Sequence, residues 1–474
     1  MTLRACCIHG HFYQPPREDP ITGEIPPEPG AAPHKNWNER IFYQSYKPNA
    51  ELGNFSRISY NLGPTLADWL EQYDPKILAM IIEQGSRNYI EHGVGNAMAQ
   101  AYHHTILPLA TREDKETQIR WGIADFEHRY GHKPSGFWLP ETAVDLETLE
   151  ILALCGIQFT ILAPWQAESE DLDVTQPYWV KLPGDQSIAV FFYQMELSGM
   201  VSFQPNKTQN ADEFVTQEIL PRYADQNDHD QLIMIASDGE LYGHHQPFRD
   251  KFLQFLTSSA LENHNVNLTY PGLWLKNHPP KSEIRIRENT SWSCFHGVTR
   301  WSGVCACALH GEWKAPLRQG LDRIAKLVDD QYLDFARRHV PDPWKLRHNY
   351  LSVHLRLATV EELLYAEVDH PLSREQIRTF ALLLAAQYER QRIYTSCGWF
   401  FDDFDRIEPR NIIAYAAQAV WLTWLATGVN LKQHAEEALR HVQSWRSGLR
   451  ADTVFDHQLE RARLVHEQSK LDGS

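Results

Sequence analysis

The chain has 474 residues, of which 43% are hydrophobic and 22% are charged. This length and composition are typical of a globular protein with one large domain and one smaller domain. The 45 Lys and Arg residues against 61 Asp and Glu residues give a formal net charge of −16. Nucleic acids and anionic membranes bind basic surfaces, so the sequence argues against both as partners.

The sequence shows no sign of export or of a membrane span. Residues 1–10 have no basic region followed by an apolar one, and no stretch reaches about 18 uninterrupted apolar residues. The seven cysteines cannot all pair internally, because their number is odd. We therefore expect a cytoplasmic protein with reduced thiols.

The first half of the chain alternates short apolar runs with helical patterns. The runs predict strands at residues 4–11, 136–139, 159–163, 188–193 and 232–237, and the periodic patterns predict helices at 66–83 and 114–130. Strands that alternate with helices form parallel sheets with crossovers. About seven such units favour an α/β domain over residues 1–280, folded as a closed β/α barrel and not as an open sheet.

Residues 14–57 form an insertion that is longer than barrel connections require. Seven prolines lie between residues 14 and 33, which predicts a loop. Long loops inside compact domains are usually functional or disordered. We expect a lid, because aromatic residues give the segment something to pack: Trp37, Phe42, Tyr43, Tyr46 and Phe55.

The pattern changes after about residue 281. Apolar residues at a spacing of 3.6 predict helices at residues 317–336, 344–366, 374–392, 411–426 and 431–448. The charged tail at 452–474 predicts frayed chain or a surface helix. Residues 281–474 are therefore expected to form an all-α helical bundle domain.

The first motif that carries chemistry is the segment from His9 to Pro16. Residues i and i+2 of a strand point to the same side, so His9 and His11 share a face. They lie at the carboxyl end of the first strand, which is the end that carries active sites in β/α barrels. A pair of metal ligands and a structural pair of histidines both remain open.

Carboxylates follow two of the other expected strands. Glu141 ends the segment Gly136-Phe-Trp-Leu-Pro-Glu141, in which Pro140 prevents the strand from continuing. Asp238 and Glu240 follow the apolar run at 232–236, with Gly239 between them. A surface loop residue at Glu141 and a helix cap at Asp238 are the alternatives that these segments allow separately.

Taken together, the motifs place two His and two or three carboxylates at the ends of parallel strands, beside Trp138. Aromatic rings stack on the apolar faces of sugars, and aromatic residues make up 11% of the chain, although large cores also use them. Two carboxylates at a barrel mouth are the minimum for glycoside hydrolysis. One attacks or stabilises the anomeric carbon as an anion, and the other protonates the leaving oxygen.

These segments resemble the ordered signature regions of glycoside hydrolase family 57. The first region has the type H-x-H-Q-P, with an extra Phe-Tyr here before Gln14. The second resembles Tyr102–Leu109, in which Thr105 stands where the family often has proline. The third, G-x-W-L-x-E, matches residues 136–141, and the fourth, D-x-E followed by G-H, matches Asp238, Glu240, Gly243 and His244.

The resemblance implies a distorted, incomplete (β/α)7 barrel followed by an all-α helical domain that closes the cleft. It also implies a retaining enzyme that acts on α-glucans without a metal or other cofactor. Glu141 would be the nucleophile and Asp238 the general acid/base. The side chains of His9, His11 and His104 would hold the sugar, and Trp138 would stack on it or shape its subsite. The remaining residues expected to bind substrate are Gln14, Glu240, His244 and Trp301.

Residues 394–403 in the helical half resemble the family's fifth region, which has the type S-S-D-W-x-F. This resemblance points to a subgroup with Cys and Trp in its C-terminal helices. Trp399 is the expected stacking platform on the acceptor side, with a core tryptophan as the alternative. Gly398 stands where the family has Asp, and Asp402 or Asp403 could replace that carboxylate.

Three cysteines lie close together in sequence at positions 294, 305 and 307. With His296 or His310 they could bind Zn²⁺ if the chain folds them together. The C-x-C pair lacks the common C-x-x-C spacing, so we expect no metal here and buried thiols that act as small hydrophobic side chains.

Three activities fit the resemblance: an amylase, a 4-α-glucanotransferase and a branching enzyme, each with an α-glucan oligosaccharide or polysaccharide as substrate. A second hypothesis is a metal-dependent barrel hydrolase, such as a polysaccharide deacetylase or an α-mannosidase-like enzyme. Its ion would be held by His9, His11, Asp238 and His244 or His245. A third hypothesis is a glucan-binding protein without catalytic activity.

Overall fold

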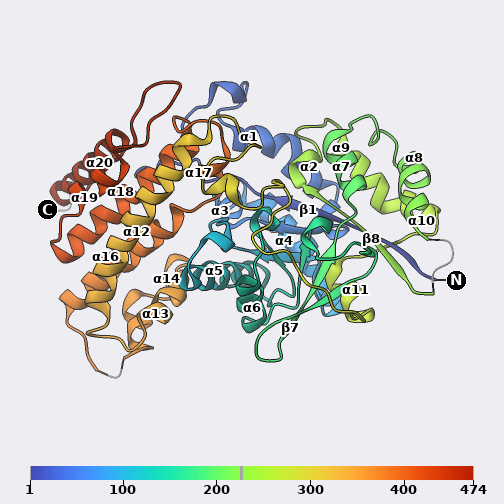
Figure 1. Ribbon diagram of the computed structural model, residues 1–474, viewed down its shortest axis with the longest axis horizontal. Helices are drawn as coiled ribbons and strands as arrows, with labels where there is room; N and C mark the ends of the chain where they lie inside the picture. Colours follow the sequence, from blue (N-terminus) through green and yellow to red (C-terminus); the bar gives the residue numbers. More distant parts are fainter. Residues whose placement is uncertain (1, 225–227, 369, 473–474) are drawn as a thin grey trace. The chain divides into compact units, whose positions relative to one another are not determined.

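The computed structural model of the chain describes residues 2–224, 228–368 and 370–472 (Figure 1). It contains two compact units. The first comprises Met1–Gln14, Pro27–Tyr102 and Asp125–Ser293, and the second comprises Pro15–Pro26, His103–Ala124 and Cys294–Ser474. The main boundary thus lies at residues 293 and 294 instead of 280 and 281, and two earlier segments belong to the second unit.

The first unit is built on a mostly parallel arrangement of strands. The larger sheet has the order β4-β3-β2-β1-β8, with β9 paired to the first half of β1, and the smaller sheet has the order β5-β7-β6. The described pairings are parallel except for that of β6 with β7. The strands are β1 (Arg4–Phe12), β2 (Ser59–Leu62), β3 (Ala97–Gln100), β4 (Phe137–Trp138), β5 (Phe159–Leu162), β6 (Tyr178–Lys181), β7 (Ser187–Phe192), β8 (Gln231–Asp238) and β9 (Asn267–Leu268).

The α/β class expected for this half of the chain is confirmed, and the barrel is distorted. One parallel bridge, between Gly136 and Phe159, links the larger sheet to the smaller one. At the other side, the backbone N–H of Gln194, after β7, donates to Met234 of β8. The described strands therefore form a ring that hydrogen bonds close only in part.

Helices connect these strands and cover them. They are α3 (Pro64–Tyr73), α4 (Pro75–His92), α5 (Arg112–Tyr130), α6 (Leu146–Leu154), α7 (Met195–Phe203), α8 (Ala211–Phe214), α9 (Arg249–Phe255), α10 (Leu261–Asn263) and α11 (Pro271–Asn277). The prediction of a single helix at 66–83 is wrong, because α3 ends at Tyr73 and Asp74 separates it from α4. The Asp74 carboxylate accepts a hydrogen bond from the Ile77 N–H, and Pro75 occupies the first turn, so a second helix starts there.

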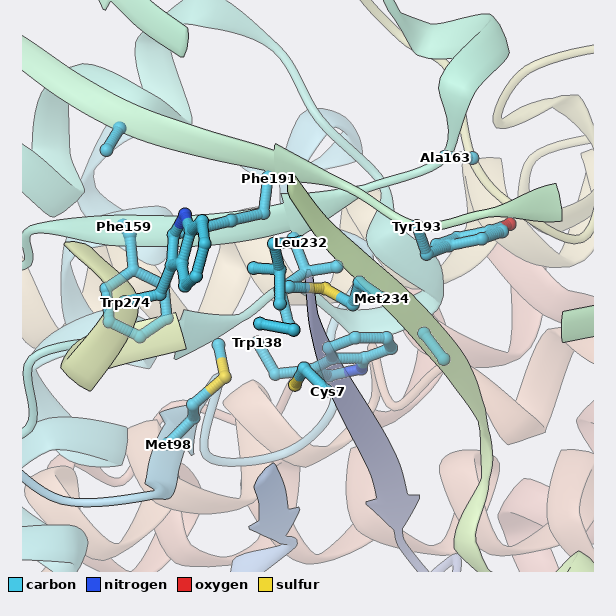
Figure 2. Close-up of a cluster of buried hydrophobic side chains, with 14 residues drawn as sticks. Cys7, Met98, Trp138, Phe159, Ala163, Phe191, Tyr193, Leu232, Met234 and Trp274 are labelled. Atoms are coloured by element: carbon cyan, nitrogen blue, oxygen red, sulfur yellow. The ribbon is translucent and has the colours of Figure 1, made fainter. Parts of the chain in front are cut away.

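The core of the barrel is apolar and rich in aromatic and sulfur-containing side chains (Figure 2). Cys7 of β1, Met234 of β8 and Trp138 of β4 belong to one buried cluster, although their strands are far apart in the sequence. Phe159, Phe191 and Trp274 extend this cluster. Burial of such side chains is the main stabilising contribution to a fold of this kind, and here it places Trp138 beneath the strand ends.

The segment expected to be a loop from residue 14 to residue 57 is partly helical. It contains α1 (Trp37–Ile41), a π-helical stretch at Phe42–Tyr46 and α2 (Lys47–Glu51). Phe42, Tyr46 and Phe55 are buried, whereas Tyr43 is half exposed. Residues 15–26 belong to the second unit and the rest to the first. A lid function for this segment remains a prediction.

The second unit is helical, as expected. Its helices are α12 (Lys314–Ala336), α13 (Pro343–Asn349), α14 (Leu351–His354), α15 (Val360–Tyr365), α16 (Arg374–Arg392), α17 (Cys397–Phe400), α18 (Ile407–Thr427), α19 (Lys432–Leu439) and α20 (Ala451–Asp472). Helices α12, α16, α18 and α20 lie side by side in Figure 1. In the described part of the chain, no helix is long and apolar enough to cross a membrane.

Two of the expected helices are wrong in extent. The pattern at 344–366 is divided among three helices, because Arg356 adopts the left-handed conformation and Thr359 starts a new helix with a capping box to Glu362. The pattern at 431–448 ends as a helix at Leu439. The charged tail forms α20, which buries Phe455 and Leu459.

A buried ion-pair network stabilises the second unit. Asp114 contacts Arg390 at 2.5 Å and Arg347 at 3.1 Å, and Gln391 donates a hydrogen bond to it at 2.6 Å. Burial alone would raise the pKa of Asp114, but the two guanidinium groups lower it to about 2. The network ties the start of α5 to α13 and α16.

Candidate active site

Glu141 is held in a strained turn directly after β4. Pro140 ends the strand, and Glu141 has a φ of 58°, a left-handed conformation that is rare for a residue with a side chain. The indole Nε1 of Trp292 donates to Glu141 Oε2 at 3.0 Å, and the hydroxyl of Ser293 donates to the same oxygen at 2.6 Å. Two donors on one oxygen stabilise the ionised carboxylate.

Asp238 lies at the last position of β8, opposite His11 in the parallel register with β1. Solvent reaches its side chain, although protein atoms surround it densely. Loss of hydration and, secondarily, the negative charge of Glu141 raise the pKa of Asp238 to about 7. The two carboxyl groups are therefore close enough to interact electrostatically, and Asp238 retains a large protonated fraction near neutral pH.

Glu240 is a buried carboxyl group that is bonded within the protein. It accepts a hydrogen bond from the Tyr46 hydroxyl at 2.7 Å and from the backbone N–H of Tyr13 at 3.1 Å. Gln14 donates from Nε2 to the Tyr46 hydroxyl at 2.9 Å. Burial and the charge of Asp238 raise the pKa of Glu240 to about 8, so it is mostly neutral at pH 7. Gln14 and Glu240 are thus joined through Tyr46.

His9 and His11 share a face of β1, as expected, and both rings stack on Trp138, with centroid separations of 4.6 and 5.2 Å. Burial lowers the pKa of His9 to about 3 and that of His11 to about 4, so both are neutral at physiological pH. His11 Nδ1 lies 2.9 Å from Asn61 Nδ2 and 3.2 Å from Asn61 Oδ1, so the Asn61 amide holds the ring in place.

The role expected for His9 does not fit its position. Its Nδ1 lies 2.9 Å from the Ser59 hydroxyl, its Nε2 lies 3.2 Å from Asn61 Oδ1, and the side chain is fully buried. Both ring nitrogens are therefore bonded to protein groups. His9 positions Trp138 and Asn61 instead of contacting a sugar.

Sequence reasoning missed several residues that build this site. Asn61 is the third residue of β2, and it donates to Gln100, the last residue of β3, at 2.5 Å. Each of these strands has only four residues and includes a polar one near its end, so no apolar run marked them. For the segment with Trp292 and Ser293, the sequence led to a prediction only about its cysteine. Nothing in the local sequence indicates the hydrogen bonds of these two residues to Glu141.

His244, a candidate ligand of the metal-dependent hypothesis, contacts other protein groups. Its Nδ1 is 2.6 Å from Gln44 Oε1, and its ring packs edge-on against Trp37. Among the described residues, the groups of three or more potential ligands with mutually adjacent atoms do not include His9, His11, Asp238 or His244. The geometry therefore does not support that hypothesis.

The remaining candidates belong to the second unit. His104 lies there with its Nδ1 2.6 Å from the Ser396 hydroxyl. Trp301 and Trp399 are at most 1% exposed, so neither presents an open face to a sugar, and the alternative of a core tryptophan is favoured for Trp399.

Packing explains why glycine, and not a larger residue, stands at position 398 of the fifth region. A Cβ atom at Gly398 would lie 2.5 Å from Ile412 Cγ2, so a side chain does not fit there without a shift. Asp402 and Asp403, the suggested replacements, are used inside the second unit. Arg446 donates to Asp402 at 2.6 Å, and the Ser444 hydroxyl donates to Asp403 at 3.0 Å.

The three cysteines 294, 305 and 307 lie together, with His296 beside them. Cys294 and Cys305 are buried, but Cys307 is exposed, so the expectation of buried thiols is wrong for Cys307. His310, the other candidate ligand, instead stacks on Trp445 with a centroid separation of 4.1 Å.

Two interacting carboxyl groups that follow parallel strands, one of them with a raised pKa, form the arrangement expected of a glycoside hydrolase of the barrel type. Residues 30–287, more than half of the chain, match glycosyl hydrolase family 57, and the chain belongs to this family. Residues 310–468 match a domain of unknown function, DUF3536.

Relatives of known structure or sequence agree with this assignment. Alpha-amylase 1 of Dictyoglomus thermophilum is 25% identical over 280 residues, which are 54% of this chain but only 38% of that protein. An exo-type maltose-forming amylase from Pyrococcus sp. ST04 has a TM-score of 0.74 at 14% identity, covering 96% of this chain and 88% of that one. A branching enzyme from Pyrococcus horikoshii has a TM-score of 0.64 at 14% identity, with coverages of 95% and 97%. These structures show a common fold and confirm the expected (β/α)7 type.

Proposed function

We propose that the protein is a retaining enzyme that cleaves α-glucosidic bonds of α-glucans through a covalent glycosyl-enzyme. Glu141 attacks the anomeric carbon, and Asp238 first donates a proton to the leaving oxygen and then accepts one from the incoming hydroxyl. The observation that carries the proposal is the interaction of two carboxyl groups in different surroundings. Glu141 has two hydrogen-bond donors on one oxygen, and the pKa of Asp238 is raised to about 7 by burial and by the charge of Glu141.

The surroundings of these two groups support the same roles. The strained backbone at Glu141, with Trp292 and Ser293 on one oxygen, holds the nucleophile in a single orientation. His11 is neutral, and the Asn61 amide holds its ring, so it is suited to hydrogen-bond to a sugar hydroxyl. Trp138 fixes the two histidine rings by stacking, which gives it the role of shaping the subsite.

The substrate class rests on family membership and on the relatives, which include two amylases and a branching enzyme. Hydrolysis and transfer share the glycosyl-enzyme, and they differ in whether water or a sugar hydroxyl attacks it. Product analysis with amylose, maltoheptaose and glycogen separates the activities. New reducing ends identify an amylase, redistribution of chain lengths without them identifies a glucanotransferase, and new α-1,6 linkages identify a branching enzyme.

Two measurements test the mechanism itself. Proton NMR of the first product should show the α-anomer before mutarotation, because retention requires two inversions. In the Asp238→Ala variant, azide should restore turnover of an aryl α-glucoside with a good leaving group and give the α-glucosyl azide. A β-anomer as first product would overturn the proposal. A folded protein that forms no product from any of the glucans would also overturn it. If that protein still binds glucan, the result would support a non-catalytic binding protein.

A further inference from the structure

The second unit contains a cluster of four side chains that the proposed reaction does not use: Cys294, His296, Cys305 and Cys307. The ligand atoms of these residues all lie within 4.8 Å of one another. Among the described residues, this is the group of three or more potential metal ligands found with their ligand atoms so close together. We propose that this cluster is a structural site for one Zn²⁺ ion, bound by three thiolates and one imidazole. The proposal departs from the sequence-based expectation that no metal binds here.

The distances match tetrahedral coordination. With Zn–S bonds of about 2.3 Å and a Zn–N bond of about 2.0–2.1 Å, tetrahedral geometry puts two sulfurs about 3.8 Å apart and a sulfur and a nitrogen about 3.5 Å apart. The Cys294 sulfur is 3.4 Å from that of Cys305 and 3.8 Å from that of Cys307. His296 Nδ1 is 3.2, 3.5 and 3.9 Å from the sulfurs of Cys307, Cys305 and Cys294, respectively.

The same distances favour one ion over a larger cofactor or a disulfide. An iron–sulfur cluster distributes its thiolate ligands over more than one iron, which requires some ligand atoms to be farther apart than this set. A disulfide needs sulfurs about 2.05 Å apart, whereas the cysteines here are not bonded to one another. Four ligand atoms that surround one point fit a closed, four-coordinate structural site.

The backbone presents the ligands in two similar turns. In the first, Cys294 and His296 are separated by one residue, and the backbone N–H of His296 hydrogen-bonds to the Cys294 sulfur. In the second, Cys305 and Cys307 have the same spacing, and the N–H of Cys307 hydrogen-bonds to the Cys305 sulfur. Backbone N–H groups directed at sulfur are the usual outer contacts of metal-bound thiolates, since they stabilise the negative charge.

Positive charges next to the cluster fit an anionic centre. Three thiolates, a neutral imidazole and Zn²⁺ together carry a charge of −1. Lys314 is fully buried, and its ammonium group donates to the backbone carbonyl of Arg300 at 3.1 Å. Burial and the Arg300 charge lower the pKa of Lys314 to about 8, and negative charge on Cys305, Cys294 or Asp402 would oppose this shift. An anionic metal centre beside Lys314 would therefore favour its charged form.

The segment around the cluster has little regular structure to hold it in place. From Cys294 to Trp313, a stretch that lies wholly in the described part, the helical elements are two short 3-10 turns at Thr299–Trp301 and Gly311–Trp313. A long loop of this kind inside a compact unit needs another constraint. A bound ion supplies it, because the free energy of binding adds to the stability of the folded loop.

The direct test is the metal content of the full-length protein, purified without chelator from zinc-replete cells. Elemental analysis should find one zinc per chain, and X-ray absorption should find three sulfur neighbours at about 2.3 Å and one nitrogen neighbour at about 2.0–2.1 Å. Substitution with Co²⁺ should give the intense visible absorption of a tetrahedral thiolate site. Wild-type protein with only traces of metal, or with a Cys294–Cys305 disulfide by mass spectrometry, would overturn the proposal.

Matched variants assign the ligands. Cys307→Ser changes an exposed residue and should lower zinc affinity at least about tenfold, whereas Cys155→Ser, outside the cluster, should leave it unchanged. His296→Asn should weaken binding, whereas His310→Asn should not. Circular dichroism checks that each variant is folded. Equal zinc content in Cys307→Ser, His296→Asn and wild type would place the metal elsewhere and reject this site.

Discussion

His11 and Asp238 lie opposite each other, in register, on the adjacent parallel strands β1 and β8. Because neighbouring parallel strands end at the same edge of a sheet, this pairing places a neutral imidazole beside a carboxyl group whose pKa is raised to about 7. Glu141, at the end of β4, interacts electrostatically with the same carboxyl group. Strand register thus places His11 beside the proposed acid/base, and the turn after β4 brings in the proposed nucleophile.

Glu141→Gln removes the proposed nucleophile but keeps the shape of the side chain. The amide oxygen can still accept the hydrogen bonds of Trp292 and Ser293, so the fold should be intact. We expect glucan turnover to fall by at least about 10⁴-fold, as for other covalent catalysts that lose their nucleophile. Chain-length analysis after single and multiple turnovers measures this. Glu170→Gln at an exposed position is the control, and substantial activity in Glu141→Gln would reject the assignment.

The activity should depend on pH through Asp238. Its carboxyl must be protonated to assist the leaving group, and its pKa is raised to about 7. The value of kcat/KM should therefore decrease as the pH rises through about 7. Asp238→Asn should lower turnover of maltoheptaose by about 10²–10⁴-fold, and should affect an aryl glucoside with a good leaving group far less. A basic limb that persists unchanged in Asp238→Asn would exclude Asp238 as its source.

Glu240 should make the folded protein less stable as the pH rises. Its folded pKa of about 8 lies above the ordinary value of 4.5. Between these two values the folded state holds more protons than the unfolded state, so the free energy of unfolding falls with increasing pH. Glu240→Gln removes this dependence and keeps an acceptor for Tyr46. Urea unfolding at pH 4.5 and pH 8.5 should show that the variant gains stability relative to wild type at the higher pH. If the difference in unfolding free energy between variant and wild type is the same at both pH values, the raised pKa of Glu240 is contradicted.

Asp114→Ala should destabilise the second unit. Loss of this carboxylate leaves the buried guanidinium groups of Arg347 and Arg390 without their shared partner, which typically costs about 3–5 kcal/mol. The control is Asp330→Ala, which removes an exposed pair with Lys326 and should cost less than about 1 kcal/mol. Urea midpoints of the two variants give the comparison. Because the pKa of Asp114 is lowered to about 2, its contribution is present above pH 3.8 and is lost as the pH falls towards 2.

Some elements were predictable because their signal is local. The run at 232–236 is apolar and contains two β-branched isoleucines, and it forms most of β8. Helix α16 coincides with the expected range of 374–392. Strands β2 and β3 were missed, since each has four residues and carries a polar side chain near its end, Asn61 in β2 and Gln100 in β3. Their polarity reflects what they contact in the folded state, which a pattern of apolar residues does not report.

The sequence by itself determined which carboxylates end strands, which histidines share a face and which family the chain resembles, because these properties depend on neighbours only a few residues away. Tertiary structure alone decided that Trp292 and Ser293 hold Glu141, and that Cys294, Cys305 and Cys307 meet around His296. Trp292 lies 151 residues from its acceptor. A contact across that span depends on how the whole chain packs, so no local propensity encodes it.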